Sequence, residues 1–452
     1  MWIIHHGTVV NEGTARMGYV LVDGTQIIEV GDGQPDSDLL ARCDTAYDAR
    51  GGYILPGVID THVHLREPGM THKADIASES RAMARGGVTS WIDMPNVVPP
   101  TVTHEAWDDK MARAEKNSVN NYAFYIGATA DNINMLARDT DYTRVAGVKA
   151  FLGSSTGGLL LNDEQALRRL FTEVPALIAV HCEDEDTIRR DTELLKAQWG
   201  DTLHARCHPM ARTAEACFRS TAHAVALARQ LGTRLHVLHI STARELSLFT
   251  PGKLADKRIT AEACLGHLWF DDNDYDRLGN RIKVNPSIKT QRDRAALRMA
   301  VANDIIDTVA TDHAPHTLDE KREKYLKSPS GMPLAQFSLV MMMELVRDGI
   351  FPIQQLVEKM SHAPAQLFGI ERRGCLRKGY AADLTVVNEL PEGHTVTDDE
   401  VTSKCAWTPL AGTTVHHTVD LTVVNGTIVH DRQHPAPHDM PLAGMPLRFN
   451  PM

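Results

Sequence analysis

Short runs of consecutive apolar and β-branched residues recur eight times through the middle of the chain. Each run has the length of a strand and lacks alternation with polar residues, which is typical of parallel strands buried on both faces. The runs cover residues 58–64, 88–95, 122–128, 145–152, 176–183, 235–241, 258–264 and 307–315.

Segments with the 3.6-residue periodicity of amphipathic helices follow most of these runs. They include residues 73–85, 163–172, 213–231 and 292–303, with further helical stretches at 334–348 and 352–368. Strands that alternate with helices indicate parallel βα units, and eight units predict a (β/α)8 TIM-type barrel of the α/β class over residues 55–370. The polar segment 317–333 is predicted to be a loop near the mouth of the barrel.

Both ends of the chain show a different pattern, in which short apolar runs alternate with turns. Asp23-Gly24 separates two such runs and predicts a β-hairpin. The sequence Gly-Thr-Val-Val at 7–10 nearly matches Gly-Thr-Ile-Val at 426–429. We therefore predict that residues 1–54 and 371–440 together form one small β-sandwich domain, followed by a C-terminal tail over 441–452.

Composition and charge narrow the function classes. Of the 452 residues, 43% are apolar and 23% are charged, as in an ordinary globular protein, and the net charge of −11 argues against binding to nucleic acid or an anionic membrane. No apolar run approaches the roughly 18–20 residues that span a bilayer. Seven cysteines without a CxxC motif and no secretory signal predict a cytoplasmic location.

Potential metal ligands stand at the ends of the predicted strands. His62 and His64 are two residues apart and point to one face of their strand, and Arg66 extends the same alternation. A His-x-His pair alone is a weak signal. However, other runs end in or carry residues of the same kind, namely Lys149, His181, His239 and Asp312. Because the carboxyl ends of the strands meet at one face of a barrel, the sequence predicts a metal site there.

The number of ligands points to two cations. Four histidines and one aspartate are one ligand more than a tetrahedral zinc site holds. Two neighbouring cations repel each other and need an anionic bridge, which a protonated lysine cannot supply. Burial favours the neutral amine of Lys149, which would react with CO₂ to form a carbamate, chemically equivalent to a bridging carboxylate.

Six motifs of the chain resemble those of a known family. They are Pro-Gly-Val-Ile-Asp-Thr-His-Val-His-Leu-Arg-Glu-Pro-Gly (56–69), Asp-Met-Pro-Asn (93–96), Val-Lys-Ala-Phe (148–151), Val-His-Cys-Glu (180–183), His-Ile-Ser (239–241) and Thr-Asp-His-Ala-Pro-His (311–316). On these residues the chain resembles the amidohydrolase superfamily and, within it, the dihydroorotases, over nearly its whole length. The motif His-x-His-x-Arg-Glu-Pro-Gly is specific, whereas the others mark the superfamily.

The resemblance implies a role for each of these residues. In the enzymes that the chain resembles, one Zn²⁺ is held by His62, His64 and Asp312. A second Zn²⁺ is held by His181 and His239, and carboxylated Lys149 bridges the two ions. The substrate is bound through its carboxylate and its ring by Arg66, Asn96, His316 and Asn285. The implied protein is a homodimer that cyclises N-carbamoyl-L-aspartate reversibly to (S)-dihydroorotate in pyrimidine biosynthesis.

The expected mechanism follows from the chemistry of amides. A bound metal lowers the pKa of water from about 15.7 to about 7 and polarises the carbonyl group. We expect a hydroxide held between the two ions to attack the cyclic amide. Asp312 is the only carboxylate among the strand-end ligands, so we expect it to act as the general base and then as the general acid.

Two other functions remain open from the sequence. Hydantoinases, dihydropyrimidinases and allantoinases are cyclic amidases that resemble this chain, but the neutral rings of the first two do not need Arg66. A catalytically inactive partner of another pyrimidine enzyme would have lost metal ligands, and this chain has all six. Arg66 and the complete ligand set therefore favour a small anionic substrate and an active hydrolase.

Overall fold

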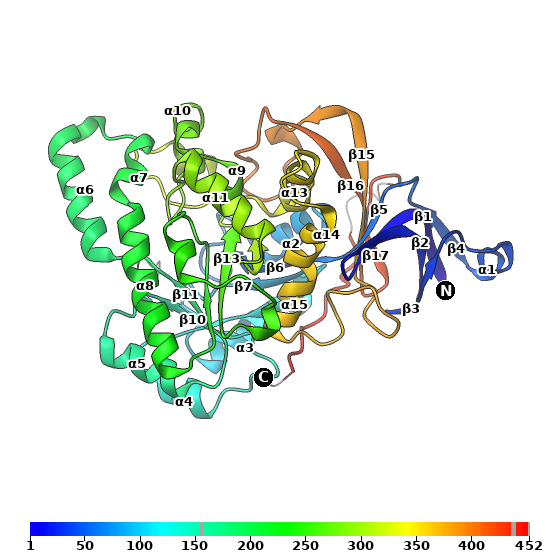
Figure 1. The fold of residues 1–452 in the computed structure, drawn as a ribbon, viewed down its shortest axis with the longest axis horizontal. Helices are drawn as coiled ribbons and strands as arrows, with labels where there is room; N and C mark the ends of the chain where they lie inside the picture. The colour runs from blue at the N-terminus through cyan, green and yellow to red at the C-terminus, as the bar shows by residue number, and fades with distance from the viewer. Residues whose placement is uncertain (154–157, 435–439, 451–452) are drawn as a thin grey trace.

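The computed structural model describes residues 1–153, 158–434 and 440–450 and contains two parallel sheets beside a larger mixed sheet (Figure 1). Residues 435–439 of the predicted β domain and 451–452 of the predicted tail lie outside the described residues. In Figure 1 the parallel strands lie near the middle, helices α5, α6 and α8 lie to the left, and the mixed sheet lies to the right.

The parallel strands coincide with the eight apolar runs. One sheet has the order β6-β7-β8 and the other the order β14-β13-β12-β11-β10-β9. The run 122–128 divides into two strands, because β8 pairs with β7 whereas β9 pairs with β10. The strands are β6 (Val58–Val63), β7 (Val88–Asp93), β8 (Asn121–Phe124), β9 (Ile126–Gly127), β10 (Val148–Phe151), β11 (Ile178–His181), β12 (Leu235–Val237), β13 (Ile259–Cys264) and β14 (Thr308–Ala310).

Burial of these strands follows the sequence pattern. Every residue of β6, β7, β10 and β11 is buried. An isolated parallel bridge between Val63 and His313 connects the end of β6 with the residues after β14. The carboxyl ends of the first and last strands therefore lie next to each other, although 250 residues separate them in the chain.

Side-chain caps start the helices where the sequence changes from polar to periodic. Asp75, Asp163, Thr213 and Thr290 each accept a backbone N–H in the first turn of a helix. The helices are α1 (Ser37–Arg42), α2 (Ile76–Arg85), α3 (His104–Asn117), α4 (Ile133–Arg138), α5 (Glu164–Glu173), α6 (Glu185–Trp199), α7 (His208–Ala211), α8 (Ala214–Leu231), α9 (Leu265–Trp269), α10 (Tyr275–Leu278), α11 (Gln291–Ala302), α12 (Leu318–Arg322), α13 (Ser338–Arg347), α14 (Ile353–Val357) and α15 (Ala363–Phe368).

Helix α12 is a difference from the sequence analysis, which predicted only a loop over 317–333. The helix begins with a capping box, in which Thr317 caps the backbone of Glu320 and the side chain of Glu320 caps that of Thr317. The pattern Thr-x-x-Glu was present in the sequence and was missed. Later in the segment, Pro329, Ser330 and Gly331 line the pocket described below.

The mixed sheet contains strands from both ends of the chain. Its order is β17-β16-β15-β5-β1-β2-β3, with β4 on β1, and β5 pairs antiparallel with β15. The hairpin predicted at Asp23-Gly24 is present between β2 and β3. The two-layer sandwich predicted for these segments stays a prediction. The strands are β1 (Trp2–Asn11), β2 (Thr14–Asp23), β3 (Gln26–Asp32), β4 (Thr45–Asp48), β5 (Tyr53–Pro56), β15 (Leu384–Thr395), β16 (Thr414–Val424) and β17 (Thr427–Asp431).

The C-terminal residues lie against the parallel strands. Backbone hydrogen bonds connect Tyr122 on β8 with Met445 and Leu447, and the side chains of Leu447 and Phe449 are buried. Among the described residues, no helix combines the length and the apolar character that crossing a membrane requires.

Candidate metal centre and substrate pocket

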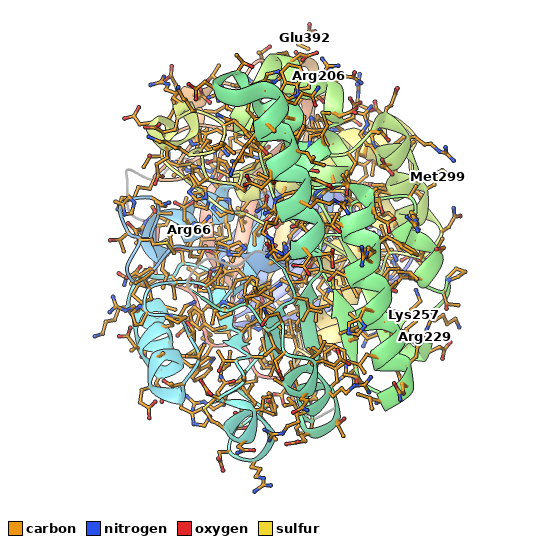
Figure 2. The ribbon with its side chains drawn as sticks, turned by 90° about the vertical axis from the view of Figure 1, so that its left-hand side faces the viewer. Arg66, Arg206, Arg229, Lys257, Met299 and Glu392 are labelled. Atoms are coloured by element: carbon orange, nitrogen blue, oxygen red, sulfur yellow. The ribbon has the colours of Figure 1, made fainter. Side chains whose placement is uncertain are left out.

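A cavity of about 550 Å³ opens at the carboxyl ends of the parallel strands. Figure 2 labels Arg66, which lines this cavity, on the left of the view, and Arg229 and Lys257, which do not line it, at the lower right. Every residue that the sequence analysis assigned to the site lines this cavity. These residues are His62, His64, Arg66, Asn96, Lys149, His181, His239, Asn285, Asp312 and His316.

The first group of potential metal ligands joins β6 to the end of β14. Oδ1 of Asp312 lies 3.0 Å from Nε2 of His64 and 3.3 Å from Nε2 of His62. Burial alone would raise the pKa of Asp312, but the neighbouring His62 and His64 hold this pKa below its ordinary value. The group can therefore offer two imidazole nitrogens and an ionised carboxylate to one cation.

The second group consists of two histidines. Nδ1 of His181, the last residue of β11, lies 2.9 Å from Nε2 of His239, which follows β12. Their rings are close to perpendicular, with an interplanar angle of 81°. Two ring nitrogens that face each other at this distance inside a cavity can bind a second cation.

Each of three histidines of the site forms a hydrogen bond through one ring nitrogen, which leaves its second ring nitrogen available to bind a metal. His62 uses Nδ1 for Glu262 at 2.7 Å, and His64 uses Nδ1 for the side-chain oxygen of Asn96 at 2.8 Å. His181 uses Nε2 for Glu183 at 3.0 Å. When one nitrogen donates its proton to such a partner, the other carries the lone pair that a metal needs. The donor set and its outer partners therefore fit a metal centre.

Lys149 lies between the two groups, on β10. Its side chain is buried, and no carboxylate of the described residues forms an ion pair with it. Burial lowers the pKa of Lys149 to about 7, even though Glu262 and Asp312 raise it. Near neutral pH a large fraction of this amine is therefore neutral and nucleophilic.

The cavity wall also includes the cationic side chain of Arg66. Nε of Arg66 donates to the backbone oxygen of Pro315 at 3.0 Å, and Nη2 lies 3.1 Å from Nε2 of His316. On its other side, Nδ1 of His316 lies 3.0 Å from Nζ of Lys73, a residue that the sequence analysis missed. Burial and the charges of Arg66 and Lys73 lower the pKa of His316 well below its ordinary value, so its ring is neutral.

Arg66 reaches the cavity in a different way from the one predicted. Strand β6 ends at Val63, and Arg66 stands in a turn with φ of 66°, so strand alternation does not aim it. His239 and Asp312 also have positive φ values, of 39° and 50°. Such conformations are rare for residues other than glycine and cluster at functional sites. Backbone turns after the strands therefore direct these three side chains.

Glu262 is a further residue of the site that sequence reasoning missed. It stands in the middle of β13, is completely buried, and contacts His62 and the backbone N–H of His239. Burial alone would raise the pKa of Glu262, but His62 and His236 hold it below its ordinary value. The sequence contained a signal for this residue, because Glu262 is a carboxylate inside the apolar run 258–264.

Comparisons with known proteins identify a family and several relatives of this chain. The family model described as "Amidohydrolase family" matches residues 53–429. The chain is 34% identical over 423 residues to a dihydroorotase of Halobacterium salinarum, covering 92% of this chain and 94% of that protein. It is 30% identical over 436 residues to a dihydroorotase of Staphylococcus epidermidis, covering 96% and 100%. Among solved structures, an L-hydantoinase from Arthrobacter aurescens has a TM-score of 0.91 at 24% identity, covering 99% of each chain.

Proposed function

Because the chain belongs to the amidohydrolase family, we propose that it is a dihydroorotase, which interconverts N-carbamoyl-L-aspartate and (S)-dihydroorotate with loss or gain of one water. Several curated relatives that match over most of their length are dihydroorotases. The chain is accordingly a hydrolase that acts on cyclic amides.

The single observation that carries this function is the burial of Arg66 without an ion pair to a carboxylate of the described residues. Glu67, the acidic neighbour of Arg66 in the sequence, forms an ion pair with Arg113 instead, at 3.3 Å. A buried guanidinium without an acidic partner is costly, and an anionic substrate supplies the missing charge. Dihydroorotate carries the required carboxylate.

We propose that the centre holds two Zn²⁺ ions, the first on His62, His64 and Asp312 and the second on His181 and His239. Carboxylated Lys149 would bridge them. The imidazole and carboxylate donors suit zinc. The lowered pKa of Lys149 supports its reaction with CO₂. When bound, the ions supply a water of lowered pKa and polarise the carbonyl group under attack.

Asp312 is the residue proposed to move the proton. In ring opening, its carboxylate takes a proton from the attacking water and delivers it to the ring nitrogen as the C–N bond breaks. In ring closure, it takes the proton from the ureido nitrogen and returns it to the departing water. Its lowered pKa keeps it ionised at neutral pH, as the first step of either direction requires.

Substrate-binding residues complete the proposed site. Arg66 and His316 would hold the substrate carboxylate, with Asn96 as a further polar contact and Asn285 against the ring. His316 is neutral, so it adds a hydrogen bond without adding a charge. Binding the carboxylate at Arg66 would orient the cyclic amide relative to the metal ligands of the same cavity.

Three finer features belong to the same proposal. The parallel strands would close into a (β/α)8 barrel through the bridge between Val63 and His313. The protein would act as a homodimer, and it would work in the cytoplasm, where its seven cysteines stay reduced.

The test is hydrolysis of L-dihydroorotate beside hydantoin, dihydrouracil and allantoin, on protein whose metal content has been measured. Turnover of dihydroorotate alone, with about two metals per chain, is expected. Turnover of a neutral ring instead would keep the metal centre but overturn the role of Arg66. Absence of both metal and turnover would indicate an inactive partner of another enzyme.

A further inference from the structure

Next to the substrate pocket, a buried histidine connects the segment after α12 with a residue of the pocket wall. His208, at the start of α7, is buried with an exposed fraction of 2%. Its Nδ1 lies 2.9 Å from the hydroxyl of Tyr325. Its Nε2 lies 2.9 Å from the backbone oxygen of Val284 and 3.2 Å from Oδ1 of Asn285. Neither His208 nor Tyr325 is part of the mechanism described above.

The partners of His208 determine its tautomer. A backbone carbonyl only accepts hydrogen bonds, so Nε2 must carry the proton and donate to Val284. Nδ1 is then an acceptor, and it receives the proton of the Tyr325 hydroxyl. Burial and the charges of Arg212 and Lys283 lower the pKa of His208 well below its ordinary value, which agrees with a neutral ring.

This tautomer in turn determines the orientation of the Asn285 amide. The N–H on Nε2 of His208 faces Asn285, so an acceptor must face it, and Oδ1 is the only acceptor of that side chain. A flipped amide would bring two donors together. Asn285 lines the pocket, and no described residue accepts a hydrogen bond from its NH₂ group. The amide therefore offers a donor, not an acceptor, to the pocket.

The position of Tyr325 is itself held by a buried lysine. Nζ of Lys283 donates to the backbone oxygens of Tyr325 at 2.6 Å and Ser328 at 2.5 Å. Lys321 holds the following residues in the same way, through the oxygens of Pro329 at 2.9 Å and Gly331 at 3.0 Å. The tyrosine hydroxyl thus approaches His208 from a segment that is fixed at several points.

We propose that Tyr325 and His208 are positioning residues for substrate recognition, which hold the Asn285 amide so that its NH₂ group donates to a carbonyl oxygen of the substrate ring. The inference rests on the proposed function, because the ring of dihydroorotate supplies the carbonyl acceptor. If the Tyr325 hydroxyl is removed, the ring of His208 loses the contact that holds it on the Nδ1 side, and if the ring is removed, its N–H toward Oδ1 is lost. In either case the amide is freer to flip and to present Oδ1 to that carbonyl, which repels it.

The effect is expected on binding more than on turnover. A hydrogen bond to a carbonyl that is not attacked is equally strong in the ground state and the transition state. Its loss therefore raises KM and leaves kcat unchanged. The loss of one neutral hydrogen bond corresponds to a change of about threefold to tenfold. A purely structural role would lower stability or kcat without this selective change.

The experiment compares four variants of the metal-loaded, full-length chain. Tyr325→Phe removes only the hydroxyl, and His208→Leu removes both ring nitrogens. His208→Gln retains an amide N–H in place of Nε2–H. Tyr275→Phe is the matched control, because Tyr275 also packs against the ring of His208 but accepts only from the backbone N–H of Ile288. Steady-state kinetics and thermal melting are measured for each variant.

For Tyr325→Phe and His208→Leu we expect KM for dihydroorotate to rise about threefold to tenfold with kcat within about twofold. We expect His208→Gln to recover much of the loss and Tyr275→Phe to behave as the wild type. Unchanged KM in the first two variants, or an equal change in Tyr275→Phe, overturns the inference. If the wild type opens another ring instead, the proposed function fails, and the same comparison on that ring still decides the role of the pair.

Discussion

Replacing Arg66 with methionine tests the link between the buried charge and the substrate. Methionine keeps much of the side-chain length and removes the guanidinium. In the free protein Arg66 contacts the backbone oxygen of Pro315 and the neutral ring of His316, and no acid of the described residues forms an ion pair with it. Burial lowers the pKa of Arg66, although Asp312 and Asp93 lie near enough to raise it. Two unit charges about 4 Å apart, at an effective dielectric constant of about 20, attract each other by about 4 kcal/mol.

Part of that attraction is offset by the cost of removing the substrate carboxylate from water. A net loss of about 3 kcal/mol remains, in the range of one charge-assisted contact, and it corresponds to about a 150-fold decrease in kcat/KM for dihydroorotate. The metal content should stay at the wild-type value, because Arg66 contacts none of the proposed metal ligands.

The assay measures kcat/KM for dihydroorotate and for hydantoin with the same preparation. Lys73→Met is the matched control, since Lys73 carries a charge next to His316 but does not line the pocket. We expect a much smaller loss for this variant. A decrease below about tenfold for Arg66→Met, or an equal decrease on the neutral ring, would refute the reasoning that Arg66 binds the substrate carboxylate.

Three further predictions concern the metal centre. Glu262→Gln should weaken metal binding about 10- to 100-fold in competition with a chelator, because His62 loses its charged partner. The control Glu245→Gln should leave metal binding unchanged, because the hydrogen bonds of this buried carboxyl go to Thr221, Thr242 and a backbone N–H. Removing the metal should abolish hydrolysis of dihydroorotate and added Zn²⁺ should restore it; activity that survives complete removal would contradict the proposed centre. Burial lowers the pKa of Lys149 to about 7, so the neutral fraction of its amine rises as the pH increases through 7. Uptake of labelled bicarbonate by the metal-free protein should therefore rise with pH, reach its midpoint near pH 7 and then level off. An uptake that still increases between pH 9 and 10, as for an ordinary lysine, would disprove the perturbed amine.

The location of the site could be predicted from the sequence because parallel strands place their carboxyl ends together. His181 and His239 lie 58 positions apart in the chain, and His62 lies further from both, yet each belongs to an apolar run, and the apolar runs are strands. Once the runs are recognised, the fold class requires that these ends meet. No knowledge of side-chain contacts was needed for that step.

The direction of the Arg66 side chain could not be predicted in the same way. The alternation from His62 and His64 points to Arg66, which lines the cavity, but the strand ends before His64 and the backbone turns at Arg66 with a positive φ. Local sequence does not determine such a conformation for an arginine, since it is unfavourable by itself and persists only where the surrounding structure holds it. Arg66 lines the cavity as predicted, but the geometry predicted for it was wrong, and its role stays a prediction.

The sequence by itself determined the α/β class, the positions of the parallel strands and of several helices, and the residue types at the site. These follow from local periodicity, burial and capping, which depend on neighbours a few residues apart. Only the tertiary structure decided the partners of those residues, such as Glu262 for His62 and Tyr325 for His208, which are 200 and 117 positions away in the chain. A hydrogen bond depends on distances of a few tenths of an ångström, and only the packing of the whole chain determines distances between segments so far apart.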